Sequence, residues 1–280
     1  MATSLTGCRL LGAAALVTCC GLVGAFEPVT IAGDIPLQVQ WQAAAENGRR
    51  PAIIALHGCG GLYNNRGKFD DRYTSYAQRW NSAGWHVVAP DSFGSRDQGA
   101  ICKQSAAQRT IKVAHRRHDV LRTAAWLLTR DDVDPQRIAV VGWSHGAMTA
   151  LEVVDRSLWP TQAPAAIVMY YPGCNGWKRR ALVQPAAPLL MLLGDADEWT
   201  PAAPCKELAA RFQADYPGMA TMKIYADGHH GFDSRAQVRF RADIPAGTDQ
   251  RGVHVGGNPV AREASLLELD RFLGQHLRDR

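Results

Sequence analysis

Short apolar runs alternate with longer amphipathic segments along most of the chain. The apolar runs predict β-strands at 52–56, 86–89, 138–141, 166–170, 189–193 and 222–225. Most of these runs are continuous rather than alternating, which is typical of parallel strands that are covered on both faces. The amphipathic segments predict helices at about 70–84, 104–130, 146–158, 204–216 and 261–278.

This alternation of strands and helices predicts the fold class. It favours an α/β architecture in which right-handed crossovers build a mostly parallel central sheet with helices on both faces. The earlier stretch from Val29 to Trp41 predicts antiparallel strands at one edge of that sheet. Because no Pro- or Gly-rich linker interrupts the pattern, we interpret residues 26–280 as one domain.

The first 25 residues have a different pattern. Arg9 ends a weakly positive start, and the uncharged run LLGAAALVTCCGLVGA follows it. This run is short for a membrane-spanning helix, and residues 23–25 (Val-Gly-Ala) form a small-x-small cleavage site. We therefore expect a secretory signal peptide at 1–25, cleaved before Phe26, and a secreted or periplasmic protein with no stable membrane anchor. A buried N-terminal helix and a lipoprotein anchor are the alternatives.

The cysteines are compatible with export. Removal of the signal peptide leaves four of the seven, which are Cys59, Cys102, Cys174 and Cys205. An even set in an exported chain permits disulfides, and four cysteines allow three pairings that spacing alone does not distinguish.

The charge of the chain argues against one class of partner. The formal net charge is +5, and basic residues are scattered apart from short clusters at 115–118 and 178–180. The sequence contains no zinc knuckle, RNA-binding motif or long basic stripe, so nucleic acid is not an expected partner.

Each predicted strand is followed by a loop that carries polar or reactive residues. In chain order these loops read HGCGG, PDSFGSR, GWSHG, YPGCNGW, GDADEWTP and DGHHGFD. In open parallel sheets, ligands bind where the carboxyl ends of strands meet such loops. The sequence therefore predicts that reactive side chains gather along one edge of the sheet.

The clearest single motif is GWSHG at 142–146, which matches G-x-S-x-G between a predicted strand and a predicted helix. The glycines are needed because the tight turn holds the serine in a strained conformation and leaves no room for neighbouring side chains. Ser144 is therefore the candidate nucleophile. The side chain of His145 is expected to point away from Ser144, and its backbone N–H is expected to serve an oxyanion hole.

A serine nucleophile needs a base and an orienting acid, which are expected later in the chain in the order Ser, acid, His. Among the three acids of GDADEWTP, Asp197 is best placed to reach a histidine. Asp195 is expected to brace the loop, and Glu198 to lie on the surface. Of the two adjacent histidines in DGHHGFD, His230 is the expected base and His229 is the alternative.

The glycine-rich loop HGCGG at 57–61 follows the first predicted parallel strand. It is expected to supply the second oxyanion donor, which is the backbone amide of Cys59. The sequence has no compact set of histidines and carboxylates with the spacing of metal ligands, so we expect neither a metal nor another cofactor.

Other residues near these loops are candidates for a supporting role. Trp143, Tyr171 and Trp199 are candidate pocket residues because they lie beside the proposed site in sequence. Asp119 and Arg116 are three apart on a predicted helix and are interpreted as a structural pair.

Together these segments resemble the dienelactone hydrolase family of α/β-hydrolases, from about residue 50 to the C-terminus. The resemblance is carried by the order and spacing of LHGCGGL, PDSFGSR, RIAVVGWSHGAM, YYPGC, LLGDADEWTPAAPC and YADGHHGFD. It implies an α/β-hydrolase fold with Ser144 as nucleophile, Asp197 as orienting acid and His230 as general base.

The resemblance also implies a pairing of the cysteines. In such a fold Cys59 and Cys102 follow early strands at the catalytic edge, and Cys174 and Cys205 lie on loops after neighbouring strands. We therefore expect one disulfide within each of these two pairs.

The activity implied by the resemblance is that of a serine hydrolase acting on a small-molecule carboxylic ester or lactone. The members that cleave dienelactone use a cysteine nucleophile with a glutamate on the early loop, whereas this chain has Ser144 and HGCGG at those places. The difference favours a more general serine esterase over cleavage of dienelactone itself. The alternatives are a secreted acyltransferase or peptidase with the same triad, and a catalytically silent binding module.

Overall fold

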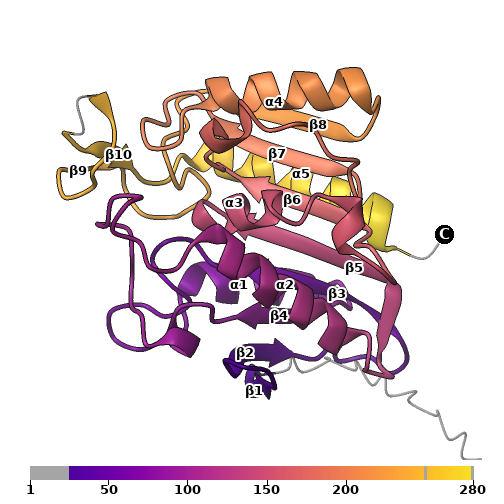
Figure 1. Ribbon diagram of the computed structural model, residues 1–280. Coiled ribbons are helices and arrows are strands. Elements are labelled where there is room, and N and C mark those ends of the chain that lie inside the picture. Colours follow the sequence, from indigo (N-terminus) through magenta and orange to yellow (C-terminus); the bar gives the residue numbers. More distant parts are fainter. Residues whose placement is uncertain (1–24, 249–250, 279–280) are drawn as a thin grey trace, which may run out of the picture.

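The computed structural model describes residues 25–248 and 251–278, so the expected signal peptide at 1–25 lies outside the described residues except for Ala25. The described residues form an eight-stranded sheet in the order β1-β2-β4-β3-β5-β6-β7-β8, with helices on both faces (Figure 1). The strands are β1 (Glu27–Ile31), β2 (Leu37–Gln42), β3 (Arg50–Leu56), β4 (His86–Pro90), β5 (Val133–Trp143), β6 (Ala166–Tyr170), β7 (Leu189–Gly194) and β8 (Ala220–Tyr225).

The direction of these strands confirms the predicted fold class. From β4 to β8 every neighbouring pair in the sheet is parallel. The β2 strand pairs antiparallel with β4, and β1 pairs antiparallel with β2. The antiparallel strands expected between Val29 and Trp41 therefore lie at one edge of a mostly parallel sheet.

The helices divide between the two faces of the sheet. On one face lie α1 (Asp71–Ser82) and α5 (Pro259–Leu277), and on the other lie α2 (Val113–Leu127), α3 (His145–Leu151) and α4 (Ala202–Asp215). No helix in the described part of the chain is both long and apolar enough to span a membrane.

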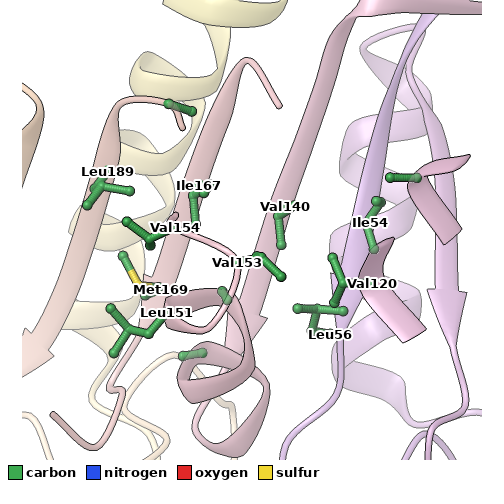
Figure 2. Packing of buried hydrophobic residues seen from close by; sticks show 14 of the residues in the cluster. Ile54, Leu56, Val120, Val140, Leu151, Val153, Val154, Ile167, Met169 and Leu189 are labelled. Atoms are coloured by element: carbon green, nitrogen blue, oxygen red, sulfur yellow. The ribbon is translucent and has the colours of Figure 1, made fainter. Parts of the chain in front are cut away.

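The central strands bury side chains on both faces, which explains their continuous apolar runs. In β3, Ile53 and Ala55 belong to the cluster under α1 and α5. Ile54 and Leu56 belong to the opposite cluster, as the two-residue period of a strand requires. Figure 2 shows both of these side chains near Val120 of α2. Each fully buried large apolar side chain contributes about 1.5–3 kcal/mol, so burial on both faces stabilises the sheet strongly.

The helix predicted at 104–130 is shorter, since α2 begins at Val113. Before that point the chain forms turns, because Ile111 packs with Phe93 and Ile101 in a separate buried cluster. Ile111 lies within the predicted helical range but outside α2. Burial against residues distant in sequence replaces helical packing at this position.

The helix predicted at 146–158 ends at Leu151. The next apolar residues, Val153 and Val154, turn into the core and are fully buried (Figure 2). The indole N–H of Trp159 donates to the carbonyl oxygen of Val153 at 2.8 Å. Burial of these side chains therefore continues past the end of the helix.

A small hairpin formed by β9 (Arg239–Arg241) and β10 (Val253–Val255) is not predicted by the sequence pattern. Its three-residue strands are too short to produce a recognisable period. The hairpin projects at the left of Figure 1, and a parallel bridge between His230 and Val255 attaches it to the loop after β8.

Candidate active site

Ser144 lies in the tight turn between β5 and α3. Its backbone has φ 54° and ψ −115°, and a positive φ is strained for a residue with a side chain. A Cβ atom on Gly142 would lie 2.4 Å from the carbonyl oxygen of Gly146. A Cβ atom on Gly146 would lie 2.0 Å from the carbonyl oxygen of Leu56. The two glycines therefore permit the turn that presents the half-buried Ser144 side chain.

We expect Gly146→Ala to destabilise the folded protein by at least about 3 kcal/mol, because the added methyl group would overlap the backbone of β3. Denaturant unfolding followed by circular dichroism measures the change. Gly176→Ala is the matched control, since a Cβ atom there would have no neighbour within 4 Å. Equal unfolding midpoints for the two variants would contradict this explanation of the turn.

His230 connects Ser144 to Asp197. Its Nε2 lies 2.8 Å from the Ser144 Oγ, and its Nδ1 lies 2.8 Å from the Asp197 Oδ2. With the Nδ1 proton donated to the buried carboxylate, Nε2 is the acceptor that faces the serine hydroxyl. The rings of Tyr171 and Trp199 flank the imidazole, each with its centroid 4.6 Å away. The structure thus brings together the expected nucleophile, base and acid from loops after β5, β8 and β7.

The Asp197 carboxylate is held by donors on both oxygens. Its Oδ1 accepts the backbone N–H groups of Trp199 at 2.9 Å and Thr200 at 2.8 Å. Its Oδ2 lies 2.9 Å from the Thr200 hydroxyl in addition to its contact with His230. The sequence reasoning missed Thr200, although an acid followed three residues later by Thr is a local hydrogen-bonding pattern typical of turns. These bonds fix the orientation of the acid before any substrate binds.

The other candidates in the two loops lie elsewhere. Asp195 is exposed, and Glu198 is exposed as expected. Glu198 accepts hydrogen bonds from the backbone and ring of His254, which lower the pKa of its carboxyl. His229 places Nδ1 3.0 Å from the carbonyl oxygen of Ala196, so its ring is engaged away from Ser144.

The loop after β3 lies against the nucleophile. A Cβ atom on Gly58 would lie 3.7 Å from the Ser144 Cβ, and the Gly58 amide donates to the Tyr73 hydroxyl at 2.9 Å. The next amide along the loop is that of Cys59. The amide of His145 is the first of α3, where helix geometry supplies no intrahelical acceptor. The two expected oxyanion donors thus belong to segments that meet at Ser144.

Disulfides join loops at the same edge of the sheet. Cys59 is bonded to Cys102, and Cys174 is bonded to Cys205, which confirms both expected pairings. The first bridge anchors the loop that carries the Cys59 amide. The second joins the loop after β6 to α4, directly after the loop that carries Asp197.

A buried arginine lies beside the two segments that meet at Ser144. Arg116 donates through Nη2 to the carbonyl oxygen of His57 and through Nη1 to Nδ1 of His145, both at 2.7 Å. Asp119 instead pairs with Arg96 through two bonds of 2.9 and 2.8 Å. The interpretation of Arg116 and Asp119 as a pair is therefore wrong. Helical spacing predicts that the side chains of Arg116 and Asp119 are near each other. It does not predict that Arg96, from another segment, forms the ion pair with Asp119.

The surroundings of the two histidines beside Arg116 favour their neutral form. Burial, and then the charge of Arg116, lower the pKa of both His57 and His145 well below the usual value. Burial also lowers the pKa of Arg116 to about 10, which leaves it charged at neutral pH. A neutral His145 agrees with its Nδ1 acting as the acceptor for the guanidinium.

We expect acid to destabilise the protein partly through His57 and His145. Their folded pKa values lie below the unfolded value of about 6.5, so below that pH the unfolded chain binds protons that the folded protein does not. The contribution of these two histidines to stability is therefore greatest above about pH 7 and falls on acidification, by up to about 1.4 kcal/mol per pH unit for each histidine.

Denaturant unfolding between about pH 7 and pH 5 measures this slope. His57→Gln should show a smaller slope than wild type because it removes one titrating group. His118→Gln is the control, since His118 is exposed. An unchanged slope in His57→Gln would show that the buried ring does not drive the effect.

The three candidate pocket residues have different surroundings. Tyr171 and Trp199 flank His230, as described above. Trp143 is 1% exposed and packs in the core against Tyr73 and Tyr76, with ring centroids 5.5 and 4.8 Å away. This corrects the expectation for Trp143, because its position at the end of β5 points its side chain toward the face covered by α1.

A buried polar cluster that the sequence does not reveal lies beside the His230 ring. The Asp233 side chain is fully buried, and its Oδ1 accepts from the Tyr171 hydroxyl and from Arg72 Nη1, both at 2.6 Å. Its Oδ2 accepts from the Tyr76 hydroxyl at 3.0 Å. A cavity of about 820 Å³ beside this cluster is lined by α1, α5 and the loop after β8. The cluster fixes the Tyr171 ring against the imidazole.

The remaining reactive side chains of the described residues are dispersed or already have partners. Across residues 25–248 and 251–278, no three His, Cys, Asp or Glu side chains gather as the ligands of an ion would. The four cysteines named above are in disulfides, and both ring nitrogens of His230 have partners.

Comparison with known proteins assigns this arrangement to a family. A model of the dienelactone hydrolase family matches residues 40–277, which is most of the chain. The chain belongs to the dienelactone hydrolase family. This confirms the resemblance of the sequence motifs and agrees with the α/β-hydrolase fold. No curated protein sequence gives a significant match.

Solved structures with the same fold include hydrolases of this family and related esterases. A dienelactone hydrolase-like promiscuous phosphotriesterase from metagenomic libraries is 19% identical with a TM-score of 0.67, and the match covers 91% of this chain and 100% of that one. Esterase 2 of Thermogutta terrifontis, phosphorylated by paraoxon, is 17% identical with a TM-score of 0.61, over 91% and 96% of the two chains. The structure of the same esterase with propionate bound is 17% identical with a TM-score of 0.60, and the match covers 92% of this chain and 96% of that one. At these identities the likeness shows the shared fold.

Proposed function

We propose that the protein is a serine hydrolase that cleaves small-molecule carboxylic esters or lactones through an acyl-enzyme on Ser144. The observation that carries this proposal is the chain of hydrogen bonds from Ser144 through His230 to the buried Asp197, with 2.8 Å at each step. Membership of the dienelactone hydrolase family and the fold shared with esterases support a hydrolase.

In the proposed reaction, Ser144 Oγ attacks the ester carbonyl carbon while His230 Nε2 takes the hydroxyl proton. Asp197 accepts the Nδ1 hydrogen bond and stabilises the imidazolium that forms. When the tetrahedral intermediate collapses, the bond to the alcohol oxygen breaks and His230 gives its proton to that oxygen. Water then attacks the acyl carbonyl and passes a proton to His230. The bond between the acyl carbon and Ser144 Oγ then breaks, His230 returns its proton to that oxygen, and the carboxylic acid leaves.

The negative charge of the tetrahedral intermediate needs donors close to Ser144. We assign this role to the backbone amides of Cys59 and His145, which lie on the two segments that meet at the nucleophile. Loss of one such donor typically costs about 10²- to 10³-fold in kcat. The Cys59–Cys102 disulfide would hold one of the two donors in place.

The alternative functions of the same triad differ in the acceptor of the acyl group or in the bond that is cleaved. An acyltransferase would pass the acyl group to an alcohol or amine instead of water, and a peptidase would accept an amide substrate. A binding module would form no acyl-enzyme at all. The structural relative with propionate bound is an esterase, which favours short-chain esters as the first substrates to assay.

Turnover of simple esters tests the proposal. The mature protein should hydrolyse p-nitrophenyl acetate and butyrate, and one equivalent of a fluorophosphonate should abolish that activity. Acyl transfer to an added alcohol that exceeds hydrolysis would favour the acyltransferase, and cleavage of amides alone would favour the peptidase. Absence of turnover with esters, lactones and amides would leave only a binding role.

We also propose that the working protein is one folded domain at 26–280, released by cleavage of the signal peptide at 1–25 and located outside the cytoplasm. The two disulfides are consistent with an extracellular or periplasmic protein. Intact mass of the exported protein should show a chain that begins at Phe26 with four oxidised cysteines. A cytoplasmic protein that keeps residues 1–25 and free thiols would contradict the proposal.

A further inference from the structure

Arg116 is a fully buried charged residue of α2, a helix that packs against α3 and against strands β1, β3, β4 and β5 of the sheet. Its guanidinium lies over the Phe93 ring, 5.1 Å from the centroid. Among the described residues, its Nε has no hydrogen-bond partner. Its two hydrogen bonds are therefore made by the terminal nitrogens, to the carbonyl oxygen of His57 and to Nδ1 of His145, both at 2.7 Å.

A buried charge of this kind is costly unless the fold or the function uses it, because it loses its hydration. The hydrogen-bond partners of Arg116 are a carbonyl oxygen and an imidazole nitrogen, not a carboxylate. The nearby carboxylate of Asp119 is occupied by Arg96 through two bonds. A simple structural role would be filled as well by an apolar side chain of similar volume.

The two partners identify what the guanidinium links. His57 lies two residues before Cys59, on the loop proposed to supply one oxyanion donor. His145 follows Ser144 directly and is proposed to supply the other. The planar, rigid fork of an arginine fixes the separation of two acceptors better than a flexible ammonium does. One side chain thus spans the two segments whose relative position defines the oxyanion hole.

We propose that Arg116 is a positioning residue of the oxyanion hole, which holds the two donor segments at a fixed separation and places a positive charge behind them. The inference rests on the proposed serine-hydrolase function. It predicts that Arg116 contributes mainly when the oxyanion forms, since fixed donors and charges stabilise that state more than the bound ester.

Arg122 offers a matched control on the same helix. Its guanidinium also donates to backbone carbonyls, namely those of Ile31, Ala32 and Ile35 at 2.9 to 3.0 Å. These acceptors belong to the β1–β2 edge of the sheet and not to the segments at Ser144. Loss of Arg122 therefore removes comparable bonds without touching the proposed site.

The test compares Arg116→Met with Arg122→Met in the mature protein. Steady-state kinetics with p-nitrophenyl butyrate give kcat and KM, and inhibition by phenylboronic acid reports on binding of a tetrahedral anionic adduct. Arg116→Met should lower kcat by about 10- to 100-fold with KM within about threefold, and should raise the boronate Ki by a similar factor. Arg122→Met should keep the wild-type kcat and Ki, whatever its melting temperature.

Values of kcat and Ki for Arg116→Met within twofold of those for Arg122→Met would overturn the proposal. If Arg116→Met does not fold, Arg116→Lys decides, because lysine keeps the charge but lacks the planar fork. It should lose about three- to thirtyfold in kcat at near wild-type KM, and an unchanged kcat would overturn the proposal. An inactive wild-type protein would instead refute the proposed function and this inference together.

Discussion

Ser144→Ala is expected to lower kcat for hydrolysis of p-nitrophenyl esters by about 10⁴- to 10⁶-fold. The reason is that Ser144 Oγ is the proposed attacking atom, at 2.8 Å from the His230 nitrogen that takes its proton. Alanine leaves the imidazole without a nucleophile to activate. Residual turnover would come from water attacking an ester that the oxyanion donors still polarise. Steady-state kinetics at saturating ester measures the loss.

A second serine serves as the control. Ser75 is exposed on α1 and its hydroxyl donates to the carbonyl oxygen of Asp71, so Ser75→Ala should keep the wild-type kcat. Circular dichroism should show both variants folded. A folded Ser144→Ala protein that retains more than about one hundredth of the wild-type kcat would exclude Ser144 as the nucleophile.

Asp197→Asn is expected to lower kcat by about 10⁴-fold while the protein stays folded. The backbone amides of Trp199 and Thr200 donate to one oxygen of the side chain, so the amide oxygen of asparagine should take that place. The NH₂ group then faces His230 Nδ1 and makes that nitrogen an acceptor. The ring proton moves to Nε2, which can no longer accept from Ser144.

The neighbouring acids provide controls for this prediction. Asp195→Asn and Glu198→Gln change the same loop by the same chemistry, and both side chains are exposed. Each should stay within about threefold of the wild-type kcat, as expected for surface groups outside the hydrogen-bond chain. If Asp197→Asn loses less than tenfold, or if Glu198→Gln loses more than Asp197→Asn, Asp197 is not the orienting acid.

The sequence predicts those parts of the structure that are determined by residues close together in the chain. Continuous apolar runs identify the central parallel strands because both faces of each are covered. The turn at Ser144 is predicted because two glycines and a strand-to-helix change specify it within a few residues. Once that turn identifies the nucleophile, the acid and the base are expected after it in that order along the chain. The choice of Asp197 and His230 over their neighbours agrees with the hydrogen bonds.

Features that depend on distant contacts escape prediction from the sequence. The Asp233 cluster joins side chains from α1, the loop after β6 and the loop after β8, and no local pattern links them. Arg116 has a nearby acid on its own helix, yet its partners come from the loop after β3 and from α3. Trp143 is different, since the alternation of side chains along β5 already places it on the face covered by α1.

The central claim is that Ser144 forms the acyl-enzyme, and the position of a covalent adduct tests it most directly. The mature protein is treated with a fluorophosphonate until ester hydrolysis stops, and the modified residue is located by peptide mass mapping. The account predicts one adduct, on Ser144, and no adduct in Ser144→Ala treated in parallel. An adduct on another residue, with Ser144 unmodified in the inactivated protein, would contradict it.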